Sequence, residues 1–283
     1  MPRKPGPKKS SEIRSPAGRH QPLESTEPLK VVRPPRPTGA ARSLPSMCGR
    51  FAMDQETNDL IEEFVAQGND FREWRPQYSI APTDTVPIVR ERAKDGEIVR
   101  TIEPAAWDFH PPFIKDAKRP QFNARLETVA TLGLWKSAFA SSRCIVPMRG
   151  YYEWEPRIVN GKEIKQPHFI HGPGRILAAA GIATARQIDG AWQVSTAIIT
   201  REARDASGEI HDRMPVFLPD DVYDEWLTPV RLETPEQKEH MLELLRDVSG
   251  GVASKITTYE VDRKVNSTRS ADPADPTLIE PLY

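Results

Sequence analysis

The sequence predicts an α+β fold with a mostly antiparallel, barrel-like sheet and a few flanking helices. Short apolar and aromatic runs recur along the chain, for example at residues 143–147 and 192–200, and their length is typical of strands. The dipeptides Asp95-Gly96 and Asp189-Gly190 lie between such runs and predict tight hairpin turns. Stretches with helical periodicity are few, and no internal repeat is present.

The first 46 residues differ from the rest of the 283-residue chain. They hold ten of the 28 prolines, ten Lys or Arg, three Asp or Glu and no aromatic residue. Such a segment has too little apolar surface to offset the entropy of ordering, so we expect residues 1–46 to be a disordered basic tail and residues 47–283 to form a single domain. The whole chain has 39 Lys or Arg and 40 Asp or Glu, so that domain is acidic. If it binds nucleic acid, it must do so through a local cluster of cations.

The predicted elements of the first half follow from apolar spacing and turn residues. Residues 48–53 form a short strand that enters the core. Asp54 can cap a helix over residues 55–67, and Gly68 can end it. The next expected elements are an extended or turn segment at 75–83, where prolines disfavour helix, and strands at 86–90 and 98–109.

The second half begins with residues 123–139, which we interpret as a helical stretch that Asn123 could cap. Thr234 and Gln237 form a capping box that starts another helix, with a proline at its first position. The other expected elements are strands at 143–147, 149–154, 168–170, 175–186 and 192–200, a loop leading into a strand at 211–217, a short helix at 220–227 and an extended segment with polar coil at 256–283.

Composition also excludes several classes of protein. Two cysteines, Cys48 and Cys144, are too few for a disulfide framework or a Cys-rich zinc site. No phosphate loop, dinucleotide fingerprint or zincin motif is present, so we expect no metal and no cofactor. No apolar run of about 18 residues or secretory h-region occurs, and prolines in the tail disfavour a transit peptide. We therefore expect a monomeric cytoplasmic protein with reduced thiols.

The boundary at Met47-Cys48 allows unusual chemistry. If Met47 were the true start and were removed, Cys48 would carry both a free α-amine and a thiol. The amine can form a Schiff base with an aldehyde, and the thiol can then add to the imine carbon and close a thiazolidine ring. An internal cysteine cannot react in this way because its nitrogen is an amide. An α-amine has a pKa of about 7.7–8.0, so part of it is neutral at cellular pH.

Other candidate residues each have a structural and a functional interpretation. Glu153 lies among aromatic residues, where burial would raise its pKa and suit proton transfer, although it could be a solvated strand position. His211 could be an ordinary loop histidine, and Asn123 a helix cap. Cys144 lies in a buried-strand context and is expected to be core. A thiol with a remote histidine and glutamate could also form a cysteine hydrolase.

Six ordered motifs resemble those of the SOS response-associated peptidase (SRAP) family of abasic-site processing proteins. They are Met-Cys-Gly-Arg-Phe at 47–51, Ile-Ala-Pro-Thr at 80–83, Asn-Ala-Arg at 123–125 with Glu127, Arg-Cys-Ile-Val-Pro at 143–147, Gly-Tyr-Tyr-Glu-Trp at 150–154 and His-Asp-Arg-Met-Pro at 211–215. The resemblance covers residues 47–283 and implies an SRAP-like fold. Residues 1–46 have no counterpart in it.

The resemblance implies a protein of the DNA damage response that binds single-stranded DNA and traps the ring-opened aldehyde of an abasic site as a thiazolidine. Carried over by motif, Cys48 would be the nucleophile, Glu153 the acid/base group for sugar ring opening and Schiff-base formation, and His211 an aid to proton transfer and crosslink reversal. Asn123 would orient the cysteine terminus. The resemblance also implies contacts with DNA. Arg50, Arg125 and Arg213 would bind phosphates, Trp154 would stack near the lesion, and Pro82 would contact the strand. The same Schiff base would permit weak lyase activity.

Two features depart from the family pattern. Ser79 stands where the family often has asparagine, so a contact there is expected to differ. With residues 1–46 attached, Cys48 also lacks a free amine, so either Met47 is the true start or the tail is removed. We favour the first explanation, because removing one methionine before a small residue needs no special machinery. The second corresponds to a cysteine peptidase that cleaves its own N-terminal segment before Cys48.

Overall fold

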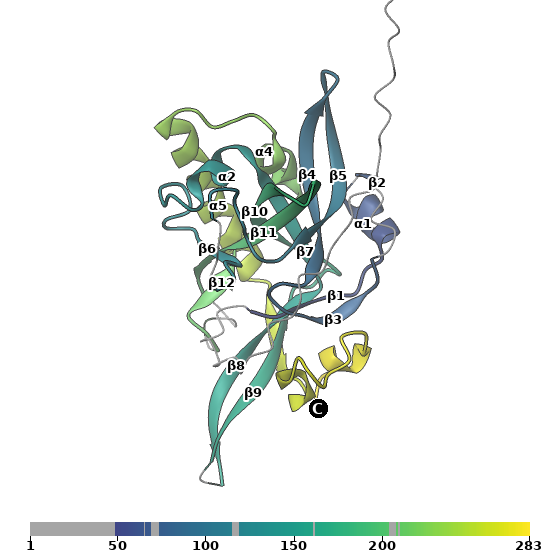
Figure 1. Cartoon of the computed structure of the whole chain (residues 1–283). Helices are drawn as coiled ribbons and strands as arrows, with labels where there is room; N and C mark the ends of the chain where they lie inside the picture. Colours follow the sequence, from purple (N-terminus) through teal and green to yellow (C-terminus); the bar gives the residue numbers. More distant parts are fainter. Residues whose placement is uncertain are drawn as a thin grey trace, which may run out of the picture.

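The structure is a computed structural model (Figure 1). It describes residues 49–64, 66–68, 74–114, 119–160, 162–203, 208 and 210–283. Cys48 and the expected tail at 1–46 lie outside the described residues. Among those that are described, no helix is long and apolar enough to cross a membrane.

Five long strands close into a barrel. The order β5 (Glu97–Ala106), β4 (Thr85–Lys94), β7 (Arg143–Met148), β10 (Leu177–Ile188) and β11 (Ala191–Glu202) is antiparallel throughout. A parallel pairing of Ser195 with Ala106 then joins β11 back to β5. Because β11 and β5 pair with each other here, neither is an open edge strand at this point, and fewer of their backbone groups are left unpaired. The predicted α+β, barrel-like and mostly antiparallel class is confirmed.

Short strands extend the barrel sheet at its margins. They are β2 (Gln67–Gly68) on β5, β6 (Asn123–Arg125) and β12 (Arg213–Pro215) on β11, and β13 (Phe217–Leu218) on β10. Both β2 and β6 run parallel to their partners, whereas β12 and β13 run antiparallel. The segment that follows β11 therefore returns along it and supplies two strands in succession.

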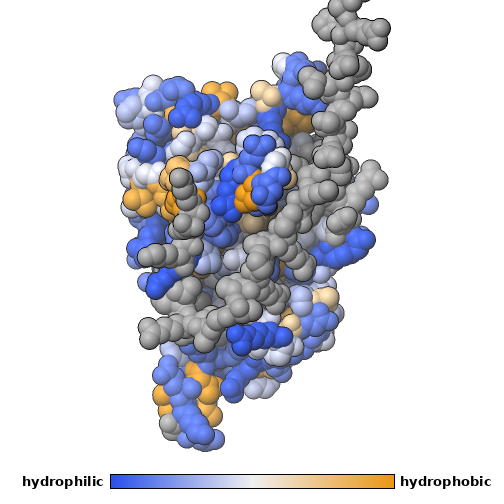
Figure 2. All heavy atoms as spheres, in the orientation of Figure 1, coloured by the Kyte–Doolittle hydropathy of each residue, from blue (hydrophilic) through white to orange (hydrophobic). Residues whose placement is uncertain are grey.

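A second sheet of five strands adjoins the barrel. Its order is β14 (Thr257–Glu260), β9 (Lys162–His171), β8 (Gly150–Val159), β1 (Phe51–Met53) and β3 (Gln77–Ile80), and every pairing is antiparallel. The β8–β9 hairpin projects from the body in the opposite direction to the β4–β5 hairpin (Figure 1). Ile158 and Val159 are exposed near its end, where the space-filling view shows hydrophobic surface (Figure 2).

Helices are few and lie outside the sheets. They are α1 (Thr57–Glu63), α2 (Lys136–Ser141), α4 (Tyr223–Leu227) and the long α5 (Pro235–Ala253), with 3₁₀ turns η1 (Asp220–Val222), η2 (Arg263–Asn266) and η3 (Pro276–Ile279). The predicted capping box begins α5, since Thr234 Oγ1 accepts from the Gln237 N–H at 3.3 Å. Both predicted hairpin turns are confirmed, with positive φ at Asp95-Gly96 and Asp189-Gly190.

Two predicted helices were wrong in their extent. Helix α1 begins at Thr57 rather than residue 55, because Glu56 and Asp59 form the capping box instead of Asp54. Gly68 does not end this helix but lies in β2. Residues 123–135 are not helical, because the backbone of Asn123 to Arg125 pairs with β11 as a strand, and only Lys136–Ser141 form α2. Tertiary pairing has overridden local propensity here.

Small residues on β10 allow close packing inside the barrel. The run Ala178-Ala179-Ala180-Gly181 is almost fully buried. A Cβ at Gly181 would lie 2.9 Å from Cys144 Sγ and 3.1 Å from a methyl carbon of Val146, too close for ordinary contact. Cys144 itself is fully buried, and this burial raises the pKa of its thiol to about 12. The prediction that Cys144 belongs to the core is confirmed.

Arg143 holds the end of the barrel to the helices around it. Its guanidinium is buried and donates to five backbone carbonyls, those of Phe139, Ala140, Trp226, Thr228 and Val230, at 2.6 to 3.1 Å. Four of these carbonyls lie at the C-terminal ends of α2 and α4, where helices leave acceptors without internal partners, and that of Val230 follows α4. Burial lowers the pKa of Arg143 to about 10, which still leaves it charged at neutral pH.

Replacing Arg143 by methionine should lower the free energy of unfolding by about 3 kcal/mol, since it leaves buried carbonyls without donors. Arg143→Lys should recover only part of this loss, because an ammonium has three donors in place of five. Denaturant unfolding followed by circular dichroism measures both. As a control, Arg231→Met removes a half-exposed side chain and should change stability by less than about 0.5 kcal/mol. Equal midpoints for the Arg143→Met variant and the parent would contradict this account.

Candidate active site

The chain that follows Cys48 is fixed against the strand that carries Glu153. In β1, Phe51 pairs with Tyr151 and Ala52 with Gly150, and the Tyr152 N–H donates to the Arg50 carbonyl at 2.9 Å. Continued by one residue, this antiparallel register sets Gly49, the first described residue, across from Glu153. The Glu153 side chain is 0% exposed. A fully buried carboxylate therefore lies on the strand next to the residue that is bonded to Cys48.

The Arg50 side chain is buried and forms hydrogen bonds with other groups of the protein. Its Nη1 donates to Ser79 Oγ at 3.0 Å and to the Val265 carbonyl at 2.9 Å, and its guanidinium lies 5.7 Å from the centre of the Trp154 ring. Burial lowers the pKa of Arg50. Ser79, where the family pattern often has asparagine, thus supplies an acceptor for this arginine. The geometry shows Arg50 as a link between β1, β3 and η2.

Trp154, on β8 of the second sheet, is held in place by hydrogen bonds. Its indole Nε1 donates to Asn266 Oδ1 at 2.7 Å, and Asn266 Nδ2 donates to the Lys165 carbonyl at 3.0 Å. The ring is half-buried and contacts Tyr152, with 6.3 Å between ring centres. An aromatic ring that is fixed on one side and partly open on the other can stack with a nucleic-acid base.

Pro82 lies in a tight turn between β3 and β4. The Asp84 N–H donates to the Ala81 carbonyl at 3.0 Å, and Asp84 Oδ2 accepts from the Ala81 N–H at 2.9 Å. Thr83 has φ of 82°, a conformation that β-branched residues rarely adopt. Its N–H donates to the Trp107 carbonyl at 2.9 Å, which holds the strained residue. Such strain is found more often at functional positions than elsewhere.

Asn123 and Arg125 are placed by β6. Asn123 pairs with Ile198 of β11 and Arg125 with Thr200. Asn123 is therefore not a helix cap, and its side chain is half-buried at the start of a strand. Arg125, at the end of β6, is exposed. It is the arginine of the predicted phosphate-binding set whose side chain reaches the surface most fully.

Arg213 forms a salt bridge with Glu127. Its Nη1 and Nη2 donate to the two carboxylate oxygens at 2.7 and 3.0 Å, and Nη2 also donates to the Thr200 carbonyl at 2.6 Å. Burial acts to raise the pKa of Glu127, but the hydrogen bonds and charge of Arg213 outweigh it and lower that pKa. The pair is thus ionised at neutral pH and fixes the turn after β6 against β12.

His211 lies two residues before the start of β12. Its Nδ1 accepts from the Arg213 backbone N–H at 3.1 Å and lies 3.1 Å from Asp212 Oδ1. The backbone N–H is an obligatory donor, so in the neutral imidazole the proton is placed on Nε2. The side chain is 21% exposed. Nε2 is therefore the atom through which His211 can exchange a proton with a ligand.

The predicted residues fall on two neighbouring parts of the fold. Arg50, Pro82, Glu153 and Trp154 belong to the second sheet and its turn. Asn123 and Arg125 lie on β6 of the barrel sheet, Arg213 lies on β12, and His211 lies just before β12. Tyr151, on the same face of β8 as Glu153, contacts Phe217 of β13 with 5.9 Å between ring centres. The face that carries Glu153 thus turns toward the β12–β13 segment.

Sequence reasoning missed several residues that support this site. Val265 and Asn266, far along the chain, fix Arg50 and Trp154. His168 and Glu155 lie beside Glu153, and no motif marked them. The alternation of Glu153, Glu155 and Arg157 along one strand was a visible sign of a charged face.

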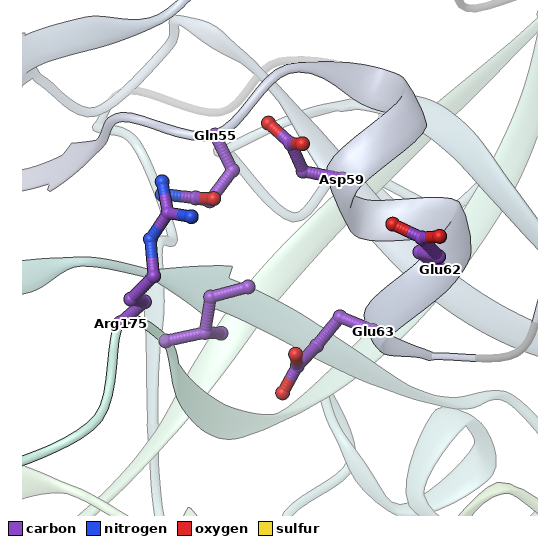
Figure 3. A pocket seen from close by; sticks show the side chains of 6 residues that line it. Gln55, Asp59, Glu62, Glu63 and Arg175 are labelled. Carbon is purple, nitrogen blue, oxygen red and sulfur yellow. The ribbon is translucent and has the colours of Figure 1, made fainter.

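A hollow beside α1 does not belong to this site. Gln55, Asp59, Glu62 and Glu63 line one side, and Arg175 and Ile176 line the other (Figure 3). Three carboxylates against one guanidinium do not suit a polyanion such as DNA. Among the residues that the structure describes, no group of three or more His, Cys, Asp or Glu is arranged to hold a metal ion.

Comparisons with known proteins agree with the motifs. The model of the SOS response associated peptidase (SRAP) family matches residues 47–268. A protein of Bacillus subtilis named abasic site processing protein YoqW is 30% identical, and the match covers 80% of this chain and 97% of that protein. The abasic site processing protein YedK of Escherichia coli is 28% identical over 64% of this chain and 79% of its own length.

Solved structures support the fold. A protein from Bacteroides thetaiotaomicron has a TM-score of 0.65 at 20% identity, with 83% of this chain and all of that chain covered. A phage-related protein from Bordetella bronchiseptica has a TM-score of 0.56 at 28% identity, with 76% and 95% covered. The family match spans both sheets and all six motifs, and the chain therefore belongs to the SOS response associated peptidase (SRAP) family.

Proposed function

We propose that this protein processes abasic sites in single-stranded DNA by forming a thiazolidine crosslink through Cys48. Relatives in Bacillus subtilis and Escherichia coli are named abasic site processing proteins. The observation that carries the proposal is the pairing of β1 with β8, which brings the residue after Cys48 next to the strand of the buried Glu153. An N-terminal cysteine placed there would have an acid/base group within reach of its reaction.

The chemistry requires proton transfer at each step. Glu153 protonates the sugar ring oxygen as the C1′–O bond breaks, and the C1′ hydroxyl gives its proton to water, which opens the ring and releases the C1′ aldehyde. The Cys48 amine adds to this aldehyde, and loss of one water gives the Schiff base. The thiolate then attacks the imine carbon, and the imine nitrogen takes up a proton as the ring closes. A positioned carboxyl group can assist these steps, and such groups contribute about 10²–10⁴-fold to rates.

His211 and Asn123 have supporting roles in this proposal. His211 offers Nε2 for proton transfer, because Nδ1 is held by the backbone of Arg213. Crosslink reversal repeats the same steps backwards and needs the same groups. Asn123 begins β6 at the edge of the barrel, where its amide would orient the cysteine terminus. Weak lyase activity would follow from the Schiff base if it eliminates before the thiol adds.

DNA binding in this proposal depends on few cations. Arg50 and Arg213 each already bind protein groups, so they hold the walls of the site and would contact a phosphate only with their remaining donors. Arg125 is the exposed member of the set. Trp154 would stack on a base, and the strained turn at Pro82 would contact the strand beside the lesion. Affinity should therefore be modest and depend on salt.

The crosslink should require Cys48 as the N-terminal residue. A chain that starts at Met47 is incubated with single-stranded DNA that contains an abasic site, and a denaturing gel should show a covalent band. Cys48→Ala should remove the band, because alanine keeps the α-amine but lacks the thiol that closes the thiazolidine, and the Schiff base that remains can hydrolyse. Cys144→Ala is the matched control, since this thiol is buried with a raised pKa and should leave the band unchanged. A band that persists in Cys48→Ala would refute the proposal.

The full-length chain separates this activity from self-cleavage. If the protein is a peptidase that removes its own tail, the 31.9 kDa chain should shorten on incubation, and Cys48→Ala should stop the shortening. Intact-mass spectrometry measures the change. A full-length chain that persists, while the chain starting at Met47 crosslinks DNA, favours Met47 as the true start and argues against self-cleavage.

Arg125→Ala should weaken binding to single-stranded DNA without changing sequence preference. The loss of one phosphate contact should reduce the slope of log K against log salt by about 0.7. Fluorescence anisotropy at several salt concentrations measures both quantities. Lys94→Ala, an exposed cation next to the β4–β5 turn, is the control and should leave affinity and slope unchanged. Equal effects of the two variants would contradict a local phosphate contact at Arg125.

A further inference from the structure

A row of ionisable side chains crosses the second sheet next to Glu153. Glu153 on β8 pairs with His168 on β9, and His168 pairs on its other side with Glu260 on β14. Directly paired residues of antiparallel strands point to the same face, with Cβ atoms about 4.5–5.5 Å apart. The three side chains therefore lie side by side, with the imidazole between two carboxylates.

Two further charges on this face connect to the row. Glu155 Oε2 lies 3.2 Å from His168 Nε2. Arg157 donates to Glu155 at 2.6 Å and to Glu260 at 2.7 Å. Its hydrogen bonds, followed by that of His168, lower the pKa of Glu155. Glu155 is thus an ionised acceptor for the Nε2–H of His168.

The exposure of these side chains rises along the row. Glu153 is 0% exposed and the His168 side chain 9%, whereas Glu155 and Arg157 are 36% and 35% exposed. Glu260 lies between these values at 27%. The array therefore leads from a carboxylate without direct access to water to a pair of charges at the surface.

Arg157 is the cation that the described residues place on this face near His168. Its neighbours along β9 on the same face are Gln166 and Ile170. The η2 segment packs on the opposite face, where Asn266 binds Trp154. Within the described part of the chain, the charged groups recorded around His168 are therefore Glu153, Glu155, Glu260 and Arg157.

We propose that His168 is a positioning residue that exchanges protons with Glu153 and with solvent, while Glu155 holds the Nε2–H side of its ring. This role rests on the proposed function of Glu153. When Glu153 gives its proton to the sugar ring oxygen, the Nδ1–H bond of protonated His168 breaks and a new O–H bond forms on Glu153. The imidazole keeps its Nε2 proton against Glu155 and regains the other from water. The histidine thus restores the acid form of a buried carboxyl group and is itself unchanged at the end.

The coupling can be measured in the full chain without DNA. NMR titration of ¹³C-labelled histidines follows all six residues, and the signal lost in His168→Gln identifies His168. As the pH rises, loss of the Glu153 proton places a negative charge beside His168. Glu153→Gln cannot supply this charge, so it should lower the measured pKa of His168 by about 1. His171, also on β9, bonds to the Gly172 carbonyl and Thr257 Oγ1, and its pKa should stay unchanged. A His168 pKa that does not move in Glu153→Gln overturns the proposal.

Crosslinking rates test the role itself. In the chain with Cys48 at its N-terminus, His168→Gln and His168→Phe should slow crosslink formation by roughly 10-fold, less than loss of a group that contacts the substrate. Their rate should also lose the pH dependence that follows the His168 titration. Glu155→Gln should shift that dependence to lower pH, because the imidazolium loses a charged partner. His168→Gln keeps a hydrogen-bond donor for Glu155 and so remains informative if His168→Phe does not fold.

The two proposals fail in different ways. A parent chain that gives no Cys48-dependent crosslink overturns the proposed function. A parent that crosslinks, together with a His168→Gln variant of unchanged rate and pH profile, overturns the role of His168 alone.

Discussion

The pairing of β1 with β8 is the constraint on which the rest of the site depends. It fixes the backbone from Arg50 to Met53, and with it the direction in which the chain approaches from Cys48. The same pairing lets Arg50 reach Ser79 and the Val265 carbonyl, which ties the C-terminal segment to the sheet. A reactive terminus needs such an anchor, because a free chain end would sample many positions and lose the advantage of proximity.

The charged side chains of this protein act mainly on groups close to them. Residues 47–283 are acidic overall, and the buried Arg143 and Arg213 serve internal groups: Arg143 donates to five carbonyls and Arg213 to Glu127. DNA binding would then depend on a few exposed donors and on stacking at Trp154. In the proposed function, this division would let residues 47–283 bind DNA through local contacts, with affinity that falls as salt rises.

The barrel and the second sheet have different tasks. Closure of β11 on β5 makes the barrel a rigid support, and small residues on β10 permit its tight core. The second sheet has a projecting hairpin and a row of ionisable groups that reaches from Glu153 to the surface. The barrel sheet thus supports β6 and β12, whereas the second sheet anchors β1 and carries ionisable groups that can take up and release protons.

The sequence by itself determined the class of fold, the hairpin turns, the start of α5 and the burial of Cys144, because each depends on local spacing or on a strongly apolar run. It also indicated Glu153, since the aromatic residues around it imply burial. Only the tertiary structure decided that Asn123 begins a strand, because its partner in β11 lies about 75 residues further on. The same holds for the engagement of Arg213 by Glu127 and for the place of His168 between Glu153 and Glu260. These contacts join distant segments through strand register, and no local pattern of residues records that register.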